Sequence, residues 1–478
     1  MKKDMTQGKI WQPILLFTLP IMAGNLLQQL YNAADGVIVG NFAEEGSYAL
    51  SAVGTCASMT MFFLALAIGL SVGGGIIISQ FFGAKKYDDM QRAASTVLFL
   101  LGGVGILVSI LGISFSHLIL ENILSVTPEY GILDMAITYF RIFCLGLFFQ
   151  FVYNAIAAML RNVGDSRATL YFLLISSVLN IGLDLLFVAG FRWGVAGAGW
   201  ATVIAQIVCA FVSFIYMYRR HPELRPNRRK KLFDRKLCAL TLKLGLPTAA
   251  QQALVSMGHM AMQRLVNSFD VIRVAEGLEP ASMAAYTAAL RIEQFAMIPS
   301  IAFNNGTATF VGQNIGARQV DRARKGMKQT QVVAVIVCVV ISTLIVGFAR
   351  PISQFFSLEG EALMRCVEQV RYVTPFFIIF AVNQCFAGFL QGAGDVFYPM
   401  IGSLSSLATR AITGYSGNYL GIFGYNAPWI TMPLGWFFYL LITMSRYLSG
   451  RWKKKALVSQ GPDNQDPDHI SETDVEPL

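Results

Sequence analysis

Charged and chemically reactive side chains are scarce in this chain of 478 residues. Asp, Glu, Lys and Arg together make up 14% of it, compared with roughly 25% in soluble globular domains. There are four histidines, and the seven cysteines are an odd number without a CxxC spacing. These shortages argue against a disulfide framework, a catalytic pair or a metal cluster. We therefore expect no enzyme, no bound metal and no cofactor.

Long apolar runs make up most of the sequence. Hydrophobic residues account for 55% of the chain and the mean hydropathy is +0.54, while a bilayer-spanning helix needs about 20 apolar residues. The runs predict an all-α integral membrane protein with twelve transmembrane helices. We expect these helices at residues 12–39, 50–80, 93–116, 131–159, 168–189, 194–218, 239–269, 281–313, 329–349, 366–391, 396–416 and 426–447.

Lys and Arg are unevenly divided between the two sets of loops that alternate along the chain. The loops on the side of the chain ends hold 27 of them, and the opposite loops hold four, Arg192, Arg273, Arg350 and Arg365. By the positive-inside rule this predicts cytoplasmic N- and C-termini in the cell (inner) membrane. The net charge of +9 then reflects topology, and we expect no nucleic-acid partner.

The second half of the chain repeats the first. The matching pairs are Pro20 and Pro247, Gln80 and Gln313, Gly83 and Gly316, Ala84 and Ala317, Gly164 and Gly394, and Asp165 and Asp395. Because each repeat has an even number of spans, we expect two six-helix lobes related by a pseudo-two-fold axis along the membrane normal. The predicted parts are an N-terminal lobe at 1–218, a basic cytoplasmic linker at 219–238, a C-terminal lobe at 239–450 and a disordered cytoplasmic tail at 451–478.

A polar stripe follows one face of the first span. Its residues are Asn25, Gln28, Gln29, Asn32 and Asp35, spaced three or four apart. Such a stripe must face protein or water, because polar groups in lipid need partners. The amides alone are also typical of contacts between helices, whereas a carboxylate inside a membrane indicates a functional site.

The second lobe has a similar stripe on the seventh span. It consists of Gln252, Ser256, His259, Gln263 and Asn267, and the eighth span adds Arg291 and Glu293. Glu293 either pairs structurally with Arg264 or Arg291, or binds substrate. We expect a substrate cavity formed by Gln28, Asn32, Gln252, Ser256, His259, Gln263 and Glu293.

Several motifs together resemble the multidrug and toxic compound extrusion (MATE) transporters. They are NAADGVIVGNFAEEGSYALSAVG, QFFGAKK, RNVGDSR, LNIGLDLLF and ALRIEQFAMIPSIAFNNGTATFVGQNIGAR. The resemblance implies export of organic, often cationic, compounds in exchange for entering protons or sodium.

The resemblance also implies where the coupling ion binds. Family members that couple through the first lobe use an Asp in the first span and an Asn-x-x-x-Asp pair in the fifth, which match Asp35, Asn180 and Asp184. Further polar positions of that site match Gln28, Tyr139, Asn154 and Thr202. The NorM branch instead places carboxylates in the middle of the seventh and tenth spans, where this chain has none. The DinF-like branch is the closer match.

The chemistry of these residues suits either coupling ion. Asp35 and Asp184 both fall in the outer half of their spans, given a rise of about 1.5 Å per residue. Neighbouring carboxylates in a poorly solvated pocket bind protons tightly. Carboxylate and amide oxygens are also suitable ligands for a hard cation, so Asp35, Asn180 and Asp184 could instead bind sodium. Pro20 and Pro247 each remove a backbone hydrogen bond and predict hinges.

We therefore expect a secondary active multidrug exporter that works by alternating access. Its partners would be small-molecule substrates and membrane lipid, and it would be a monomer. The alternative is a flippase for a lipid-linked glycan precursor, since related flippases share the two-lobe plan. A channel or receptor is disfavoured, because the internal repeat and the intramembrane carboxylates suit alternating access better.

Overall fold

The computed structural model describes residues 4–42, 47–123, 132–226, 232–275, 281–419 and 426–457. The chain divides into two compact units. Unit 1 consists of Met1–Asp4 and Leu19–Ala249, and unit 2 consists of Met5–Thr18 and Ala250–Leu478.

Twelve long helical segments account for most of the described residues. They are α1 (Trp11–Phe42), α2 (Ser47–Gly83), α3 (Tyr87–Ser114), α5 (Ile132–Asn162), α6 (Ser166–Asp184) with its continuation η3 (Leu185–Gly190), α7 (Gly194–Arg220), α8 (Arg235–Ala275), α9 (Ser282–Gly316), α10 (Val320–Gly347), α12 (Gly360–Val373) with η5 (Thr374–Phe376) and α13 (Phe377–Gly392), α14 (Phe397–Tyr419) and α15 (Ala427–Leu448). The short elements are α4 (Ser116–Leu118), η1 (Ile119–Ile123), η4 (Pro222–Leu224), α11 (Ala349–Gln354) and η7 (Arg451–Lys455).

The twelve predicted spans are confirmed. Among the described residues, nine helices are long and apolar enough to cross a membrane by length and composition. The other three long helices are α8, α9 and α14, which contain the second-lobe polar residues. The described part of the chain has no strand, so the fold is that of an all-α multi-pass membrane protein.

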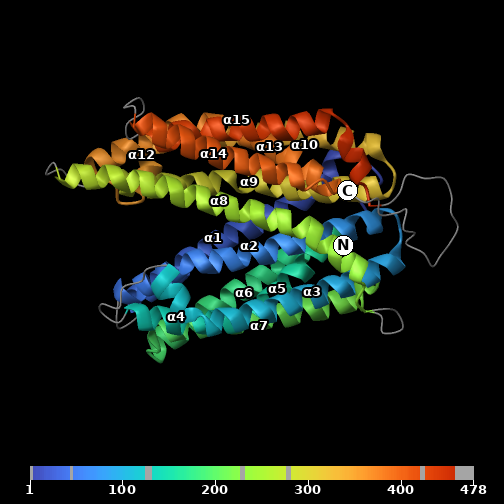
Figure 1. Cartoon of the computed structure of the whole chain (residues 1–478), viewed down its shortest axis with the longest axis horizontal. Helices are drawn as coiled ribbons and strands as arrows, with labels where there is room; N and C mark the ends of the chain where they lie inside the picture. The colour runs from blue at the N-terminus through green and yellow to red at the C-terminus, as the bar shows by residue number, and fades with distance from the viewer. Residues whose placement is uncertain are drawn as a thin grey trace. The chain divides into compact units, whose positions relative to one another are not determined.

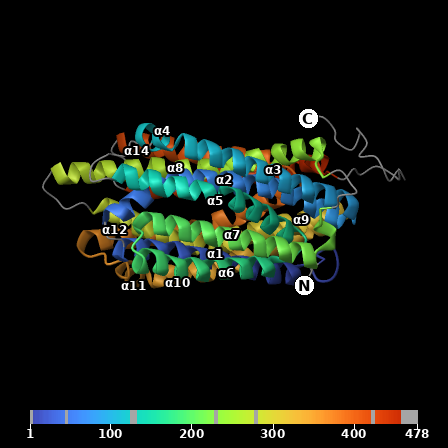
Figure 2. The same cartoon turned by 90° about the horizontal axis from the view of Figure 1, so that it is seen from below.

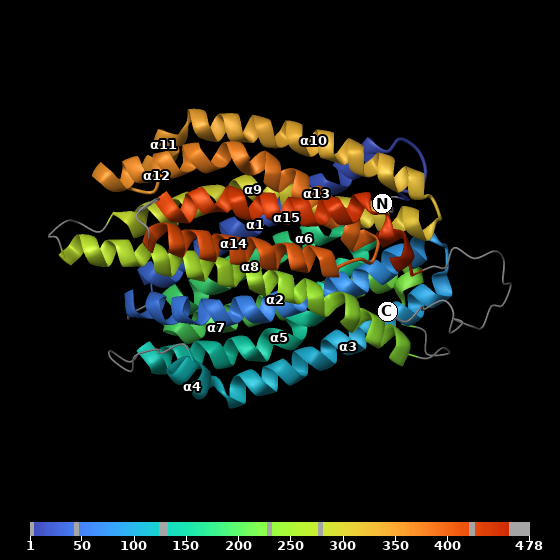
Figure 3. The same ribbon diagram turned by 45° about the horizontal axis from the view of Figure 1, so that its top comes forward.

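The same packing pattern occurs in both units. In unit 1, α5 packs against α2, α3 and α7, and α6 packs against α7 (Figures 1 and 2). In unit 2, α13 packs against α9, α10 and α15, and α14 packs against α15 (Figure 3). The correspondence confirms that each lobe is one copy of a repeated helix bundle. The axis that relates the lobes stays a prediction.

The loops that match in sequence also match in backbone conformation. Lys85 and Arg318 both have a positive φ, 58° and 59°, directly after the matching helices α2 and α9. Gly164 and Gly394 have φ values of 90° and 85° at the next matching turn, where glycine adopts the left-handed conformation without strain. These turns end each helix in the same way in both repeats.

Two helices contribute to both units. The boundary in α1 falls between Thr18 and Leu19, next to Pro20, and the boundary in α8 follows Ala249, two residues after Pro247. The first part of α8 packs closely on α2 within unit 1, since a Cβ added at Gly73 would lie 2.5 Å from the backbone nitrogen of Gly245. The lobe boundaries expected at residues 218 and 239 stay predictions.

The tail begins in an ordered form, which corrects the prediction of disorder from residue 451. Residues Arg451–Lys455 form η7, and Trp452 is 1% exposed. The Trp452 ring lies 4.7 Å from the Phe389 ring, and its nitrogen donates to the Tyr447 carbonyl at 3.0 Å. The buried Trp452 ring therefore anchors the start of the tail, although the composition of the tail is polar. Residues 458–478 lie outside the described part of the chain.

Candidate functional site

The first-lobe site is built at the end of α6. Asn180 and Asp184 lie four residues apart and therefore share one face of the helix. Their exposed fractions are 1% and 0%. The backbone changes from α-helix to π-helix directly after Asp184, over Leu185–Gly190. A π-helical turn inside a long helix is often found at functional sites.

Thr202 of α7 completes a hydrogen-bonded group with these two residues. With the Asn180 amide oriented to satisfy both of its atoms, its nitrogen donates to Asp184 Oδ2 at 2.8 Å and its oxygen accepts from the Thr202 backbone N–H at 3.2 Å. The Asn180 amide also lies 3.4 Å from the Thr202 hydroxyl. A buried carboxylate beside amide and hydroxyl oxygens can hold a proton or a hard cation.

Tyr139 and Asn154 lie at different depths on α5. Tyr139 is buried, and a Cβ added at Gly199 would lie 3.6 Å from its ring, so Tyr139 is within about one turn of Thr202. Asn154 donates to the Gln150 carbonyl of its own helix at 2.8 Å. It lies fifteen residues beyond Tyr139, or about 22 Å along the helix, so the structure does not bring it to Asp184.

The first-span residues are described only in part. Asp35 and Asn32 lie within α1, but their side chains are outside the described part of the structure. Gln28 is exposed. The sodium site at Asp35, Asn180 and Asp184 therefore stays a prediction.

The seventh-span stripe lies on α8, away from the core of unit 2. Gln252, Ser256 and Gln263 are exposed, and His259 is partly buried. The neighbouring Gln251 faces the other way: it is 8% exposed and donates to the Tyr439 hydroxyl at 2.7 Å. Its oxygen accepts from Gln391 at 3.3 Å. The accessible polar residues are those expected for substrate, whereas Gln251 joins helices within unit 2.

Glu293 is buried in unit 2, at 2% exposure, and pairs with an amide. Gln369 of α12 donates to Glu293 Oε1 at 3.0 Å, while Glu293 Oε2 has no hydrogen-bond partner among the described residues. Among the described residues, Glu293 forms no ion pair with Arg264 or Arg291, the structural alternative considered for it, and both arginines are exposed.

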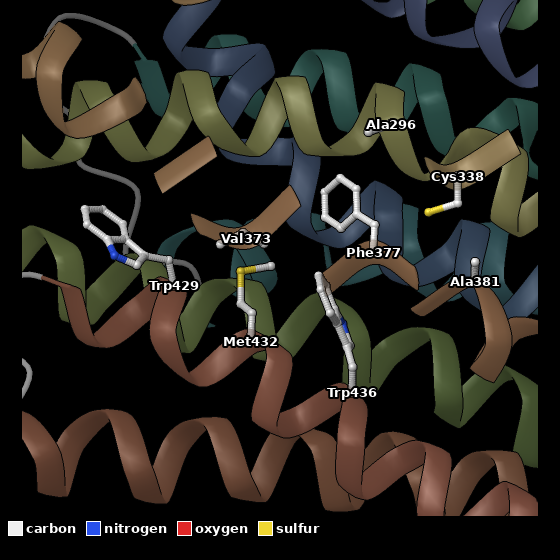
Figure 4. Close-up of a cluster of buried hydrophobic side chains, with 8 residues drawn as sticks. All are labelled: Ala296, Cys338, Val373, Phe377, Ala381, Trp429, Met432 and Trp436. Carbon is white, nitrogen blue, oxygen red and sulfur yellow. The ribbon is translucent and has the colours of Figure 1, made fainter. Parts of the chain in front are cut away.

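An apolar cluster begins next to the pair formed by Glu293 and Gln369, and the charge of Arg410 also acts on Glu293. Ala296 and Val373, about one turn further along α9 and α12, begin a buried cluster whose Phe377 and Trp436 rings lie 5.7 Å apart (Figure 4). An ionised carboxylate in such surroundings is costly unless it has a compensating partner. The arrangement favours a carboxyl that binds a proton or a cation.

Two features of this site had no signal in the sequence, namely the role of Gln369 and the burial of Arg410. Arg410 of α14 is 7% exposed, and its Nε and Nη2 have no hydrogen-bond partner among the described residues. Unsatisfied buried donors in a native protein require an explanation such as a bound ligand or water. The pairing of Gln369 could not be predicted from the sequence, because its partner Glu293 lies on another helix.

A titratable cluster joins Asp165, at the turn between α5 and α6, to the end of α7 and the residues that follow it. The His221 ring lies 3.1 Å from Asp165 Oδ2 and 3.1 Å from Glu223 Oε1, and the Tyr216 hydroxyl donates to Asp165 Oδ2 at 2.9 Å. Burial favours the neutral carboxyl, but the hydrogen bonds from His221, Tyr216 and the Ala168 N–H outweigh it and lower the pKa of Asp165. Burial likewise favours neutral imidazole, but the bonds to Asp165 and Glu223 raise the pKa of His221.

No group of three or more His, Cys, Asp or Glu side chains that could hold a metal ion occurs in the described residues.

The long helices, the repeated bundles and the buried intramembrane carboxyls define a membrane transporter. The MatE family model matches residues 20–186 and 247–416. The chain therefore belongs to the MatE family, the multidrug and toxic compound extrusion transporters, and is a transporter rather than an enzyme.

Individual relatives agree with this assignment over nearly the whole chain. The probable multidrug resistance protein YpnP of Bacillus subtilis is 28% identical, covering 96% of this chain and 99% of the relative. YoeA, another probable multidrug resistance protein of that organism, is 26% identical, with 95% and 96% covered. A MOP superfamily transporter from Pyrococcus furiosus has the same fold, with a TM-score of 0.85 at 22% identity and coverage of 94% and 98%.

Proposed function

We propose that this chain is a secondary active multidrug exporter that antiports organic, often cationic, compounds against protons or sodium by alternating access. It would act as a monomer in the cell membrane with both termini cytoplasmic. The proposal is supported by the relatives named as probable multidrug resistance proteins, whose matches cover 96% and 95% of this chain. The assignment to the DinF-like branch stays a prediction.

The observation that carries the proposal is the fully buried Asp184, hydrogen-bonded by Asn180 and close to Thr202. An ion that binds there neutralises a carboxylate within a membrane-spanning segment, where an unbalanced charge is costly. Asp35 is expected to join this site from α1, with Tyr139 as a polar neighbour, whereas Asn154 lies about 22 Å further along α5 and would act apart from it. Ion binding would then bias the backbone at the π-helical turn after Asp184.

Substrate would bind to polar residues that remain accessible. Gln252, Ser256 and Gln263 of α8 are exposed and His259 is partly buried, and Gln28 and Asn32 are the expected contribution of α1. Glu293 and Arg410 would form a second buried polar centre within unit 2, because their charges interact and both side chains have unsatisfied atoms. Pro20 and Pro247 would act as hinges, since each lies where its helix passes from one compact unit to the other.

The flippase alternative is not favoured. A lipid-linked glycan precursor has an anionic linkage, and Asp184 together with Asp35 would repel it. The matched relatives are named for multidrug resistance and not for glycan export.

Transport in proteoliposomes tests the proposal. The purified protein is reconstituted, a fluorescent organic cation is loaded, and proton and sodium gradients are imposed separately. We expect one of the two gradients to drive export well above the rate of empty liposomes. Equal, passive flux of the cation under both gradients and under none would contradict coupled antiport.

A further inference from the structure

A groove of about 1300 Å³ lies on unit 1 between α3 and α7, over α5. Its walls are Leu98, Phe99 and Ile106 of α3, Phe148 of α5 and Phe214 of α7. Phe99 and Ile106 are 54% and 48% exposed. Gly103 of α3 also lines the groove, and an added Cβ there would meet no atom within 4 Å. The volume exceeds the roughly 300–1,000 Å³ of pockets for drug-sized ligands.

The groove has the length of one membrane leaflet. Its lining on α3 extends from Gln91 to Ile106, which is about 22 Å at 1.5 Å per residue. Half of a bilayer, including its headgroup region, is also about 20–22 Å thick. Gln91 precedes the predicted span at 93–116 and Ile106 lies near its middle, so we expect the groove to extend from headgroup depth to about the bilayer centre.

One end of the groove is polar and positively charged. Gln91, Ser95, Tyr218 and Arg225 line this end, and Arg225 is the single charged residue among the described lining residues. Arg225 Nε and Nη2 donate to the carbonyls of Tyr218 and Arg219, and its guanidinium lies 5.1 Å from the Tyr218 ring centroid. These contacts hold the cation at the mouth of the groove. Gln91 donates to the Pro222 carbonyl at 3.0 Å and fixes the loop before Arg225 onto α3.

We propose that this groove is a binding site for an anionic phospholipid, with its acyl chains along α3, α5 and α7 and its phosphate at Arg225. The apolar part of the groove suits an acyl chain of one leaflet, and Arg225, the one charged residue among the described lining residues, complements a negatively charged lipid. Basic pockets between transmembrane helices on the cytoplasmic side commonly bind such headgroups. The site is separate from Asp184 and does not depend on the proposed transport activity.

The test measures which lipid occupies the groove. The full-length protein is purified from membranes that contain phosphatidylglycerol and phosphatidylethanolamine, and retained lipids are counted by native mass spectrometry. We expect wild type to retain phosphatidylglycerol. Arg225→Gln should lower its apparent affinity about fivefold, the effect of removing one basic residue near a membrane surface. Gly103→Trp should displace the lipid by filling the groove.

Two controls separate a specific site from ordinary boundary lipid. Arg167→Gln removes an exposed basic residue at the start of α6, outside the groove, and should leave phosphatidylglycerol retention unchanged. A benzophenone amino acid at Phe99 should crosslink phosphatidylglycerol above its bulk fraction, and one at Val178, which is 65% exposed on α6, should not. Crosslinking at Phe99 in proportion to bulk lipid, or retention unaffected by Arg225→Gln and Gly103→Trp, would overturn the proposal.

Discussion

Two aspartates that match in the repeat have different partners. Asp165 is held by His221 and Tyr216, whereas Asp395 accepts from Arg446 Nε at 2.6 Å. The Arg446 guanidinium also lies 4.2 Å from the Tyr398 ring centroid. Arginine remains charged at all relevant pH values, while histidine titrates near neutrality. The turn in the first lobe is therefore contacted by a histidine that titrates near neutrality, and the matching turn in the second lobe has an arginine in its place.

The His221 cluster gives a prediction for stability against pH. The pKa of His221 is raised from 6.5, so its contribution is complete below pH 6.5 and is lost as pH rises through the raised value. The pKa of Asp165 is lowered from 3.8, so its contribution is present above pH 3.8 and is lost as pH falls through the lowered value. The cluster should therefore stabilise the protein most between pH 3.8 and pH 6.5, where both contributions are complete.

His221→Gln should remove the loss of stability at high pH. At pH 6 it should lower the free energy of unfolding by about 1–3 kcal/mol, because buried acceptors lose their donor, and the difference from wild type should shrink toward pH 9. Thermal unfolding in detergent at both pH values measures this. His117→Gln is the control, since the His117 side chain is 61% exposed. An equal deficit of His221→Gln at both pH values would refute the titration.

At the scale of helices, the close approach of α2 and α8 limits what can replace glycine. A Cβ at Gly73 would lie 2.5 Å from the Gly245 nitrogen and 2.7 Å from the Thr241 carbonyl oxygen, both backbone atoms that cannot rotate away. Gly73→Ala should therefore lower the free energy of unfolding by about 1–3 kcal/mol through overpacking.

Gly54→Ala is the matched control for that substitution. Gly54 is on the same helix, and an added Cβ would meet no atom within 4 Å, so alanine should leave stability unchanged or raise it through helix propensity. Unfolding of both variants in the same detergent measures the difference. Equal stabilities would show that α2 and α8 are less closely packed than the structure has them.

The helices were predictable from sequence because the bilayer requires long apolar runs. The predicted helix ends are wrong where the helices extend beyond the bilayer, since the helix there need not be apolar. Helices α3 and α10 begin at Tyr87 and Val320, about six and nine residues before the predicted spans, because charged first turns form helix without apolar character. In the candidate site, the regular spacing of Asn180 and Asp184 was visible. The pairing of Glu293 with Gln369 was not, because contacts between distant helices leave no local pattern.

At the scale of the whole molecule, the two lobes share a packing pattern but differ in their polar centres. In unit 1, the buried Asp184 belongs to a hydrogen-bonded group. In unit 2, Glu293 lies next to an apolar cluster, and its Oε2 has no hydrogen-bond partner among the described residues. A repeat that keeps its helices and changes its buried carboxyls allows one lobe to couple to an ion while the other serves a different role. Our account assigns ion coupling to the first lobe.

Gradient-driven export by Asp184→Asn tests this assignment most directly. Asparagine keeps the size of the side chain but cannot exchange a proton or supply a charge to sodium. Asp134→Asn, an exposed aspartate in the first turn of α5, is the control. In proteoliposomes we predict export at the level of empty liposomes for well-folded Asp184→Asn and wild-type export for Asp134→Asn. Wild-type export with unchanged ion dependence in Asp184→Asn would contradict the account and direct attention to Glu293.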